Sequence, residues 1–245
     1  MPRRVGVMGG TFDPVHIGHL RAAEECLEEL DLEVVLFIPA ADPPHKAGPK
    51  VLLFEHRWRM LELAVAGHPR FRLSDVERQR RGKSYTFHTL TWLREKGPYR
   101  DAELFFLVGL DAFLELDTWY RYKDLFRLAH MGVMRRPGYP EDDVARFLRE
   151  KVSPLYAESP GTGVFHHPGL LAVHTVRNSH LEISSTHIRR LAAARKSVRY
   201  LVLPEVMGYI FDNCLYHGKY PSLDEKGANR ENARTQCSGE GGGNV

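Results

Sequence analysis

The sequence has few cysteines and no long apolar segment. Its three cysteines, Cys26, Cys214 and Cys237, are odd in number, lie far apart and lack C-x-x-C spacing. This pattern argues against a disulfide framework and a thiolate zinc site, and it favours a reducing compartment. No signal peptide is visible at the start, and no stretch approaches a membrane-spanning length. We therefore expect a cytoplasmic protein without a membrane partner.

The sequence also has little net charge, +3 from 34 basic and 31 acidic residues. This excess is too small to indicate nucleic-acid binding, so no nucleic-acid partner is expected. Basic residues cluster locally at 77–83 and 187–196. Such clusters are compatible with an anionic small-molecule ligand, although most single arginines are better explained as solvated surface residues.

Short apolar runs alternate with amphipathic segments along most of the chain. The pattern predicts strands at 5–8, 33–39, 70–77, 102–109, 131–136 and 170–176. It predicts helices at 19–30, 54–67, 84–97, 122–129, 141–152, 184–195 and 204–216. Such alternation is typical of an α/β fold with a doubly wound, mostly parallel sheet and helices on both faces. The stretch 153–168, rich in proline and glycine, is predicted to be a loop.

The last 28 residues, 218–245, differ in composition from the rest of the chain. They contain Gly, Asn, Glu and Lys but almost no apolar side chains. Such a segment cannot recover its ordering entropy by burial. We therefore expect one folded domain at 1–217 and a disordered tail at 218–245.

The segment "GGTFDPVHIGH" (9–19) directly follows the first predicted strand. Open α/β sheets bind ligands beyond the carboxyl ends of their strands, so this segment should line that crevice. Gly9 and Gly10 allow backbone N–H groups to approach a ligand closely. The helix that follows offers free N–H groups and the positive end of its dipole. The segment therefore suits a phosphate group.

Three interpretations of His16 and His19 compete. Zinc would need further ligands, and no recognised ligand spacing supplies them, so no protein metal site is expected. Packing and helix capping would explain one isolated histidine better than two in a glycine-rich loop. We favour the third interpretation, in which both rings bind phosphate oxygens and stabilise the charge that develops during nucleotidyl transfer.

Two motifs carry a resemblance to a known superfamily. "GGTFDPVHIGH" resembles the signature loop of the nucleotidyltransferases with an H-x-G-H motif, and "ISSTHIR" (183–189) resembles their second motif. The resemblance implies that Ser184, Ser185 and Thr186 cap a helix and that Arg189 reaches the triphosphate. It also implies a Rossmann-like nucleotidyltransferase fold.

Further stretches resemble one branch of that superfamily, the bacterial nicotinate-mononucleotide adenylyltransferases. They are "PPHK" (43–46), "SYTFHTL" (84–90), "FFLVGLDAF" (105–113), Trp119 and "RRPGY" (135–139). The likeness implies transfer of AMP from ATP to nicotinate mononucleotide, giving nicotinate adenine dinucleotide (deamido-NAD) and pyrophosphate in NAD biosynthesis. The acceptor phosphate has a second pKa of about 6, so direct in-line attack needs neither a general base nor a covalent intermediate.

The resemblance also implies a role for individual residues. Mg²⁺ would arrive with ATP and would not be held by a dedicated protein site. Tyr85 and Thr86 stand at a helix start that favours a carboxylate over an amide, and Trp119 would stack on the pyridine ring. The implied catalytic residues are His16, His19, Lys46 and Arg189. The implied ATP-binding residues are Gly9, Gly10, Thr11, Phe12, His16, His19, Gly109, Asp111, Ser184, Ser185, Thr186 and Arg189. The implied nicotinate mononucleotide-binding residues are Thr11, Phe12, His45, Lys46, Tyr85, Thr86 and Trp119.

Several alternatives remain at this point. Nicotinamide mononucleotide or pantetheine phosphate would be the acceptor of a sister adenylyltransferase, and a cytidylyltransferase would share the first and last motifs. A non-enzymatic nucleotide sensor on the same fold belongs to a different class. For Asp111, a helix N-cap is as good an explanation as adenosine binding. The sequence pattern indicates no oligomeric state.

Overall fold

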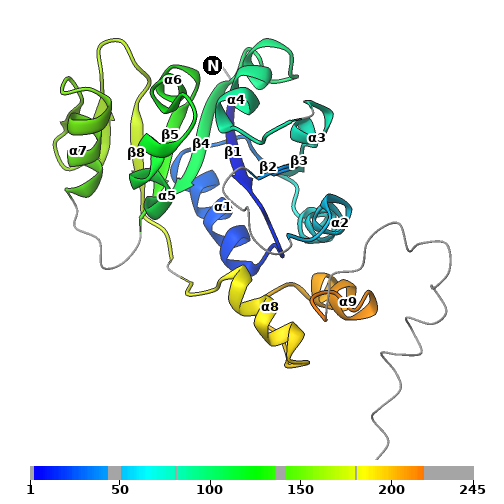
Figure 1. Cartoon of the computed structure of the whole chain (residues 1–245). Helices are drawn as coiled ribbons and strands as arrows, with labels where there is room; N and C mark the ends of the chain where they lie inside the picture. Colours follow the sequence, from blue (N-terminus) through cyan, green and yellow to red (C-terminus); the bar gives the residue numbers. More distant parts are fainter. Residues whose placement is uncertain (1–2, 44–50, 81, 136–141, 180, 218–245) are drawn as a thin grey trace, which may run out of the picture.

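The computed structural model describes residues 3–43, 51–80, 82–135, 142–179 and 181–217. Within these ranges, eight strands form one sheet in the order β3-β2-β1-β4-β5-β8-β7-β6 (Figure 1). The strands are β1 Arg4–Gly10, β2 Val34–Pro39, β3 Phe71–Leu73, β4 Glu103–Gly109, β5 His130–Met134, β6 Ala157–Ser159, β7 Val164–His166 and β8 Val173–Val176. The expected tail at 218–245 lies outside the described residues.

Most of the sheet is parallel. Strand β1 pairs in parallel with both β2 and β4, β2 with β3, and β5 with both β4 and β8. Only β6 and β7 run antiparallel, β6 to β7 and β7 to β8. The predicted doubly wound, mostly parallel sheet is confirmed. Its strand order reverses between β1 and β4, which is where such sheets open a ligand crevice at their carboxyl ends.

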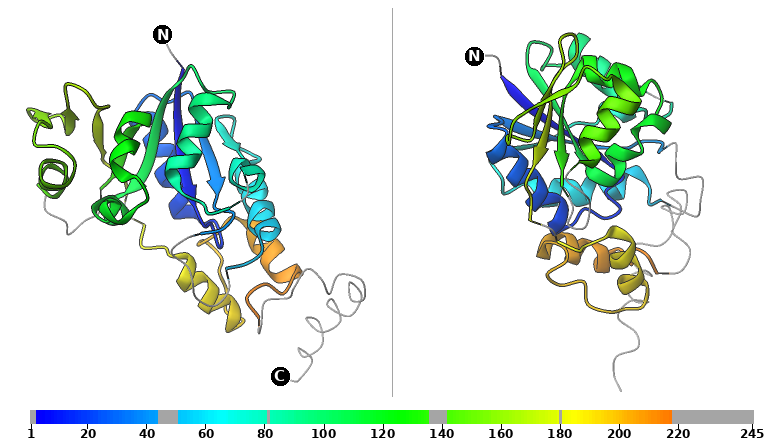
Figure 2. Two further views of the ribbon diagram at one scale, coloured as in Figure 1. Left: turned by 45° about the horizontal axis from the view of Figure 1, so that its top comes forward. Right: turned by 90° about the vertical axis from the view of Figure 1, so that its left-hand side faces the viewer.

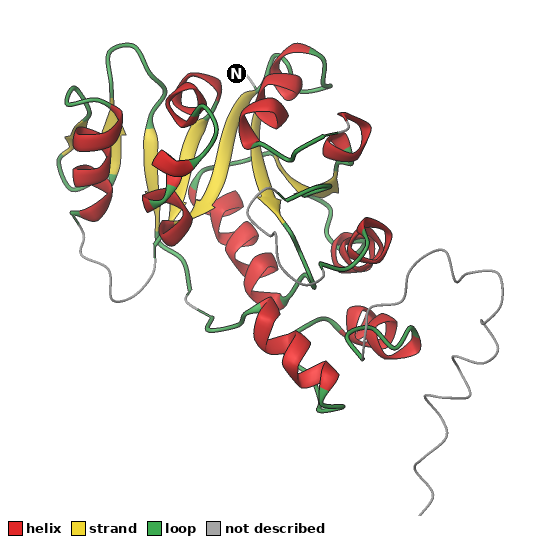
Figure 3. Ribbon diagram, in the orientation of Figure 1, coloured by secondary structure: helices red, strands yellow, loops and turns green. Residues whose placement is uncertain are grey.

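Helices cover both faces of the sheet (Figures 2 and 3). They are α1 Ile17–Glu29, α2 Phe54–Val65, α3 Val76–Arg80, α4 Thr86–Glu95, α5 Leu110–Leu114, α6 Tyr122–Leu128, α7 Asp143–Phe147, α8 Ser185–Ala193 and α9 Pro204–Asp212. Alternate residues of β1 enter different cores. Val5 and Val7 pack in the core formed with α3 to α7, whereas Met8 packs in the core formed with α1, α2, α8 and α9. This period of two is expected of a strand buried on both sides.

Two predicted elements differ from those observed. The extended segment expected at 70–77 ends at Leu73, because the amides of Arg78 and Gln79 donate to the carbonyl of Asp75 and start a helical turn. The helix expected at 141–152 is α7 up to Phe147, followed by a π turn over Leu148–Val152.

The loop predicted at 153–168 is also wrong, because it contains the hairpin formed by β6 and β7. Its turn includes Gly161 and Gly163, with φ angles of +70° and +67°, a conformation that favours glycine. Phe165 of β7 is buried and pairs with Val173 of β8. Proline and glycine mark the turns of this edge hairpin rather than the absence of strands.

Two of the cysteines lie within the described residues. Cys26 is free and buried, and burial raises the pKa of its thiol. Cys214 is disulfide-bonded, which the cysteine pattern did not predict. The expected cytoplasmic location stays a prediction.

Among the described residues, no helix is long and apolar enough to span a membrane.

Candidate active site

The site is built where two neighbouring strands end. Strand β1 ends at Gly9 and Gly10, and its parallel neighbour β4 ends at Gly109. A Cβ at position 10 would lie 2.9 Å from Cζ of Phe12, so only glycine leaves room for that ring. Phe12 is buried and has a φ of +49°, a conformation that non-glycine residues rarely adopt. The loop therefore leaves β1 in a tight, constrained turn.

The two histidines lie at the start of α1. His16 is its N-cap, and the rings of His16 and His19 stack with centroids 3.6 Å apart. The backbone N–H of His16 donates to Nδ1 of His19 at 3.3 Å. This contact is a helix-capping interaction, which the sequence led us to rate below phosphate binding. It occupies Nδ1 of His19. The other ring nitrogens keep their capacity to bind a ligand.

Both histidines are neutral at pH 7. Burial lowers the pKa of His16 to about 4. Burial and the neighbouring His16 lower the pKa of His19 well below its usual range. Because Nδ1 of His19 accepts a hydrogen bond, the ring proton of neutral His19 lies on Nε2. Nδ1 of His16 is buried and has no hydrogen-bond partner among the described residues, which is costly without a ligand.

Gly18, between the two histidines, packs closely against the ring of His16. A Cβ at this position would lie 3.1 Å from Nδ1 and 3.2 Å from Cε1 of His16. These distances are tighter than ordinary van der Waals contact. The glycine of the H-x-G-H motif therefore makes room for the His16 ring, a role that the sequence did not suggest.

Helix α8 brings the second motif to this loop. Ser185 Oγ donates to the carbonyl oxygen of Pro14 at 2.9 Å, and Arg189 Nη1 donates to that of Asp13 at 2.6 Å. Arg189 Nη2 also donates to Thr186 Oγ1 at 3.1 Å. Segments about 170 residues apart in the chain thus form one site, and α8 lies beyond the carboxyl end of β1 (Figure 1).

The expected capping by all three hydroxyl residues of this motif is only partly right. Ser184 is the N-cap of α8, and its Oγ accepts from the backbone N–H of His187 at 3.2 Å. Ser185 and Thr186 use their hydroxyl groups elsewhere, in the contacts just described. Asp111 likewise does not cap α5, because the N-cap is Gly109 and Asp111 lies in the first turn.

A buried cation behind the loop was missed by the sequence analysis. Arg57 of α2 is only 2% exposed. Its Nη1 donates to the carbonyl oxygen of Thr11 at 2.8 Å and its Nε to that of Leu52 at 2.9 Å. Burial lowers the pKa of Arg57, while the carboxylate of Asp13 acts in the opposite direction. The only sequence signal was its place on the apolar stripe of α2, three, four and seven residues before Met60, Leu61 and Ala64.

Asp13 completes this buried network. It is 3% exposed, and its Oδ1 accepts from the hydroxyl of Tyr216 at 2.9 Å. Its Oδ2 accepts from the backbone N–H of Leu52 at 3.3 Å. Because both carboxylate oxygens are engaged, Asp13 has a structural role and holds the loop to the segment after α9.

Three of the residues expected to bind the acceptor, Tyr85, Thr86 and Trp119, lie outside the loop after β1. Tyr85 is the N-cap of α4, and Thr86 is its first residue. The ring of Tyr85 lies 4.9 Å from that of Tyr120. Trp119, next to Tyr120, is half-buried and meets Phe106 of β4 edge to face at 6.2 Å. The structure thus brings Tyr85 and the Trp119–Tyr120 segment together.

The start of α4 is fixed to the end of β2. Ser84 and Asp42 exchange two hydrogen bonds of 3.0 Å, through the Ser84 N–H and the Ser84 hydroxyl group. Glu77 is buried and accepts from Thr89 Oγ1 at 2.8 Å and from the Ala41 N–H at 3.4 Å. His45 and Lys46, three and four residues after Asp42, lie outside the described residues. So does most of the 135–139 segment.

Comparison with known proteins is consistent with this geometry. The family model "Cytidylyltransferase-like" matches residues 7–191. A probable nicotinate-nucleotide adenylyltransferase of Pelobacter propionicus is 44% identical over 213 residues, covering 87% of this chain and 98% of its own. One from Acidithiobacillus ferrooxidans is 41% identical over 210 residues, covering 86% and 94%.

Solved structures share the fold. The nicotinic acid mononucleotide adenylyltransferase of Plasmodium falciparum, solved in complex with NaAD, has a TM-score of 0.65 at 16% identity and covers 87% of this chain and 97% of its own. A nicotinate-nucleotide adenylyltransferase from Vibrio parahaemolyticus, described as putative, has a TM-score of 0.57 at 16% identity, covering 89% and 98%.

Proposed function

The chain belongs to the cytidylyltransferase-like family, and on this premise we propose how it acts as a nicotinate-nucleotide adenylyltransferase. It joins the AMP moiety of ATP to nicotinate mononucleotide, giving nicotinate adenine dinucleotide and pyrophosphate. The observation that carries the proposal is the meeting of the two nucleotide motifs through Ser185, Arg189 and the carbonyl oxygens of Pro14 and Asp13. Relatives that match this chain over nearly their whole length are named as probable nicotinate-nucleotide adenylyltransferases.

In the proposed reaction, an oxygen of the acceptor phosphate attacks the α-phosphorus of ATP. The bond from that phosphorus to the oxygen bridging to the β-phosphate breaks, and pyrophosphate leaves with the electron pair. The protein must align two anions and stabilise the charge that develops on the α-phosphate and the leaving group. No proton has to be removed from the nucleophile, which suits histidines that are neutral donors.

His16, His19 and Arg189 have the donors for this task. Neutral His19 presents its Nε2–H, because its Nδ1 is held by the backbone of His16. Arg189 uses two of its nitrogens within the protein, and a guanidinium group has five N–H donors, so donors remain for phosphate oxygens. The positive end of the α1 dipole adds to these donors, although the N–H of Ile17 already donates to the carbonyl of Leu201. Lys46, outside the described residues, stays an expectation.

Mg²⁺ is expected to come with the ATP phosphates and to neutralise part of their charge. Among the described residues, no group of three or more His, Cys, Asp or Glu side chains is placed to hold a metal ion. Asp13, the acidic residue of the loop, has both oxygens engaged. We therefore assign no protein ligand to the ion.

The preference for nicotinate over nicotinamide is supported by the electrostatics around α4. Its first turn has N–H groups without partners in the helix, and its dipole is positive at Tyr85. Burial lowers the pKa of His88, and the charges of Arg80 and Arg121 lower it further. Arg80 and Arg121 thus place positive charge near the start of α4, although Arg121 is also paired with Asp124. This charge supports a preference for a carboxylate over a neutral amide.

The test is pyrophosphate release from ATP with nicotinate mononucleotide, nicotinamide mononucleotide or pantetheine phosphate as acceptor. We expect the acid to be turned over fastest. His19→Ala should remove most of this activity, whereas His166→Ala, an exposed histidine on β7, should not. Equal turnover of the nicotinamide acceptor would refute the acid preference. Full activity of His19→Ala would refute the mechanism, and no turnover of any acceptor by the wild type would favour a nucleotide sensor.

A further inference from the structure

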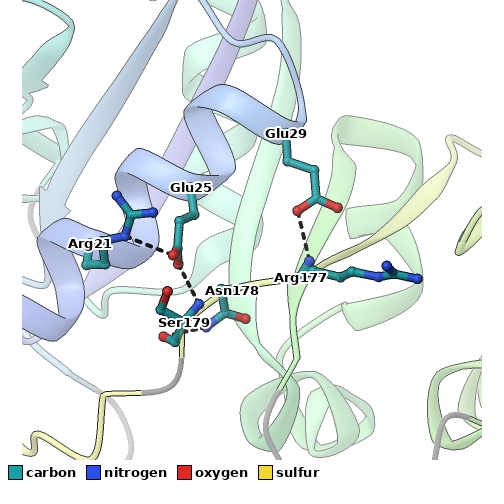
Figure 4. Close-up of polar contacts among 6 residues, drawn as sticks. All are labelled: Arg21, Glu25, Glu29, Arg177, Asn178 and Ser179. Atoms are coloured by element: carbon teal, nitrogen blue, oxygen red, sulfur yellow. Dashed lines mark hydrogen bonds and ion pairs between the residues drawn. The ribbon is translucent and has the colours of Figure 1, made fainter.

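The segment between β8 and α8 is tied to α1 by two carboxylates (Figure 4). The backbone N–H of Ser179 donates to Oε2 of Glu25 at 2.9 Å, and that of Arg177 donates to Oε2 of Glu29 at 2.9 Å. Arg21, one turn before Glu25, donates from Nε to Oε1 of Glu25 at 2.8 Å. Three residues of one helix thus hold a stretch nearly 150 residues further along the chain.

Glu25 is the better fixed of the two carboxylates. It is 8% exposed, and both of its oxygens accept a hydrogen bond. Burial alone would raise the pKa of Glu25, but hydrogen bonds from Ser179 and Arg21 outweigh burial and lower it. The group is therefore charged at neutral pH, and it accepts charge-assisted hydrogen bonds, which are stronger than neutral ones.

Helix α1 connects this anchor with the catalytic histidines. It begins directly after His16, and Glu25 lies six residues after His19 on the same helix, an axial distance of about 9 Å. Ser184, the N-cap of α8, lies five residues after Ser179 in the chain. Beyond it, Ser185 and Arg189 contact the loop after β1, so α8 is attached on one side of the described structure through its loop contacts and lies close in sequence to the anchor on α1.

The two attachments of α8 involve different groups. Arg189 contacts the Asp13 carbonyl and also belongs to the proposed phosphate-binding set. The hydrogen bonds of Arg177 and Ser179 to α1 involve no phosphate-binding group of the proposed site. They therefore do not compete with the binding of ATP.

We propose that Glu25, assisted by Glu29, is a positioning residue that fixes the Ser184–Arg189 element for binding of the ATP triphosphate. Neither carboxylate touches substrate. The proposal rests on the adenylyltransferase activity proposed above and adds to it how the second motif is placed. It predicts that removal of the anchor weakens use of ATP and leaves use of the acceptor nearly unchanged.

The variants Glu25→Ala, Glu25→Gln and Glu29→Ala test this, with Glu28→Ala as the matched control on the exposed side of α1. Glu25→Ala should lower kcat/KM for ATP about tenfold, as expected for loss of hydrogen bonds to a charged group. The KM for nicotinate mononucleotide should change less than about twofold, because α4 and Trp119 pack against the other core and not against α1. Glu25→Gln keeps an acceptor oxygen and should recover part of the loss.

Two further measurements separate positioning from general destabilisation. Amide hydrogen exchange should rise at 177–186 in Glu25→Ala and stay unchanged in the sheet, as it does when one segment opens locally. ATP affinity measured by calorimetry should fall in Glu25→Ala and in Glu29→Ala, but not in Glu28→Ala. ATP binding can be measured even if the protein turns over no acceptor. Failure of the positioning proposal can therefore be distinguished from failure of the proposed adenylyltransferase function.

Three results would overturn the inference. One is an ATP affinity of Glu25→Ala equal to that of Glu28→Ala. Another is an equal loss of kcat/KM for ATP and for the acceptor, together with faster amide hydrogen exchange throughout the domain. That combination would indicate a purely structural effect. The third is unchanged protection at 177–186, because the anchor would then not hold this segment.

Discussion

Replacement of Arg57 by methionine should lower both the stability of the protein and its turnover, because Arg57 holds the active-site loop through buried hydrogen bonds. The change removes the donors to the carbonyl oxygens of Thr11 and Leu52 and a buried positive charge that interacts favourably with Asp13. A hydrogen bond from a charged group contributes about 1.5–3 kcal/mol, so the loss of two should cost roughly 3–6 kcal/mol. Domains are stable by only about 5–15 kcal/mol in total.

This cost translates into a measurable change in melting temperature. For a domain of this size, 1 kcal/mol corresponds to roughly 2–4 °C, so Arg57→Met should melt roughly 10 °C lower than wild type. The variant that does fold should also turn over more slowly, since a catalytic group displaced by about 1 Å can lose about a hundredfold in rate. Thermal denaturation followed by circular dichroism and the pyrophosphate-release assay measure the two effects.

Two variants make the experiment specific. Arg57→Lys keeps the positive charge near Asp13 but cannot serve both carbonyl oxygens, so it should recover stability more than turnover. Arg59→Met, on the exposed side of α2, removes only a surface pair with Glu62 and should change the melting temperature by a degree or two. If Arg57→Met melted within about 2 °C of wild type with normal turnover, the loop would not depend on the buried network.

Three further predictions follow from the site. His19→Ala should lower kcat by about a hundredfold or more but weaken ATP binding far less, because the ring acts on developing charge; comparable losses in both would contradict this. Gly18→Ala should lower turnover about tenfold, because its Cβ would press on the His16 ring at 3.1 Å, whereas Gly208→Ala, with no atom within 4 Å, should behave as wild type. The free energy of unfolding should fall as the pH drops from 6.5 toward about 4, because the unfolded chain binds a proton at His16 that the folded protein excludes. His16→Asn should flatten that slope in thermal melts, leaving the part due to His19, His88, His130 and His174, whose pKa values burial also lowers.

Much of the fold could be predicted because it depends on local patterns. The alternation of apolar strands and amphipathic helices predicted the sheet, and the glycine-rich segment marked the carboxyl end of β1. The predictions failed where a short segment could adopt more than one type of secondary structure. Residues 74–80 start a helix through the Asp75 carbonyl. The hairpin after Val152 forms only because an existing strand, β8, offers an edge to pair with.

The residues of the candidate site also fall into two groups, those that the sequence indicated and those that it did not. His16, His19 and Arg189 could be recognised from the sequence because their residue types and spacing indicate binding of phosphate groups. Arg57, Glu25 and Glu77 were not, because a charged residue on a helix is usually solvated and nothing local indicates that its partners come from distant segments. Each has a partner in a distant segment, 36 to 154 residues away in the chain.

The sequence by itself predicted the chemistry of this protein: a turn suited to phosphate, attack by an acceptor phosphate that is already ionised, and the order of strands and helices that carry these features. These depend on side-chain type and on periodicities within about twenty residues. Only the tertiary structure decided which nitrogen of His19 is free, why Gly18 is a glycine, and how the two motifs are held in register. Those properties arise from burial and from hydrogen bonds between segments that the chain brings together only when it folds.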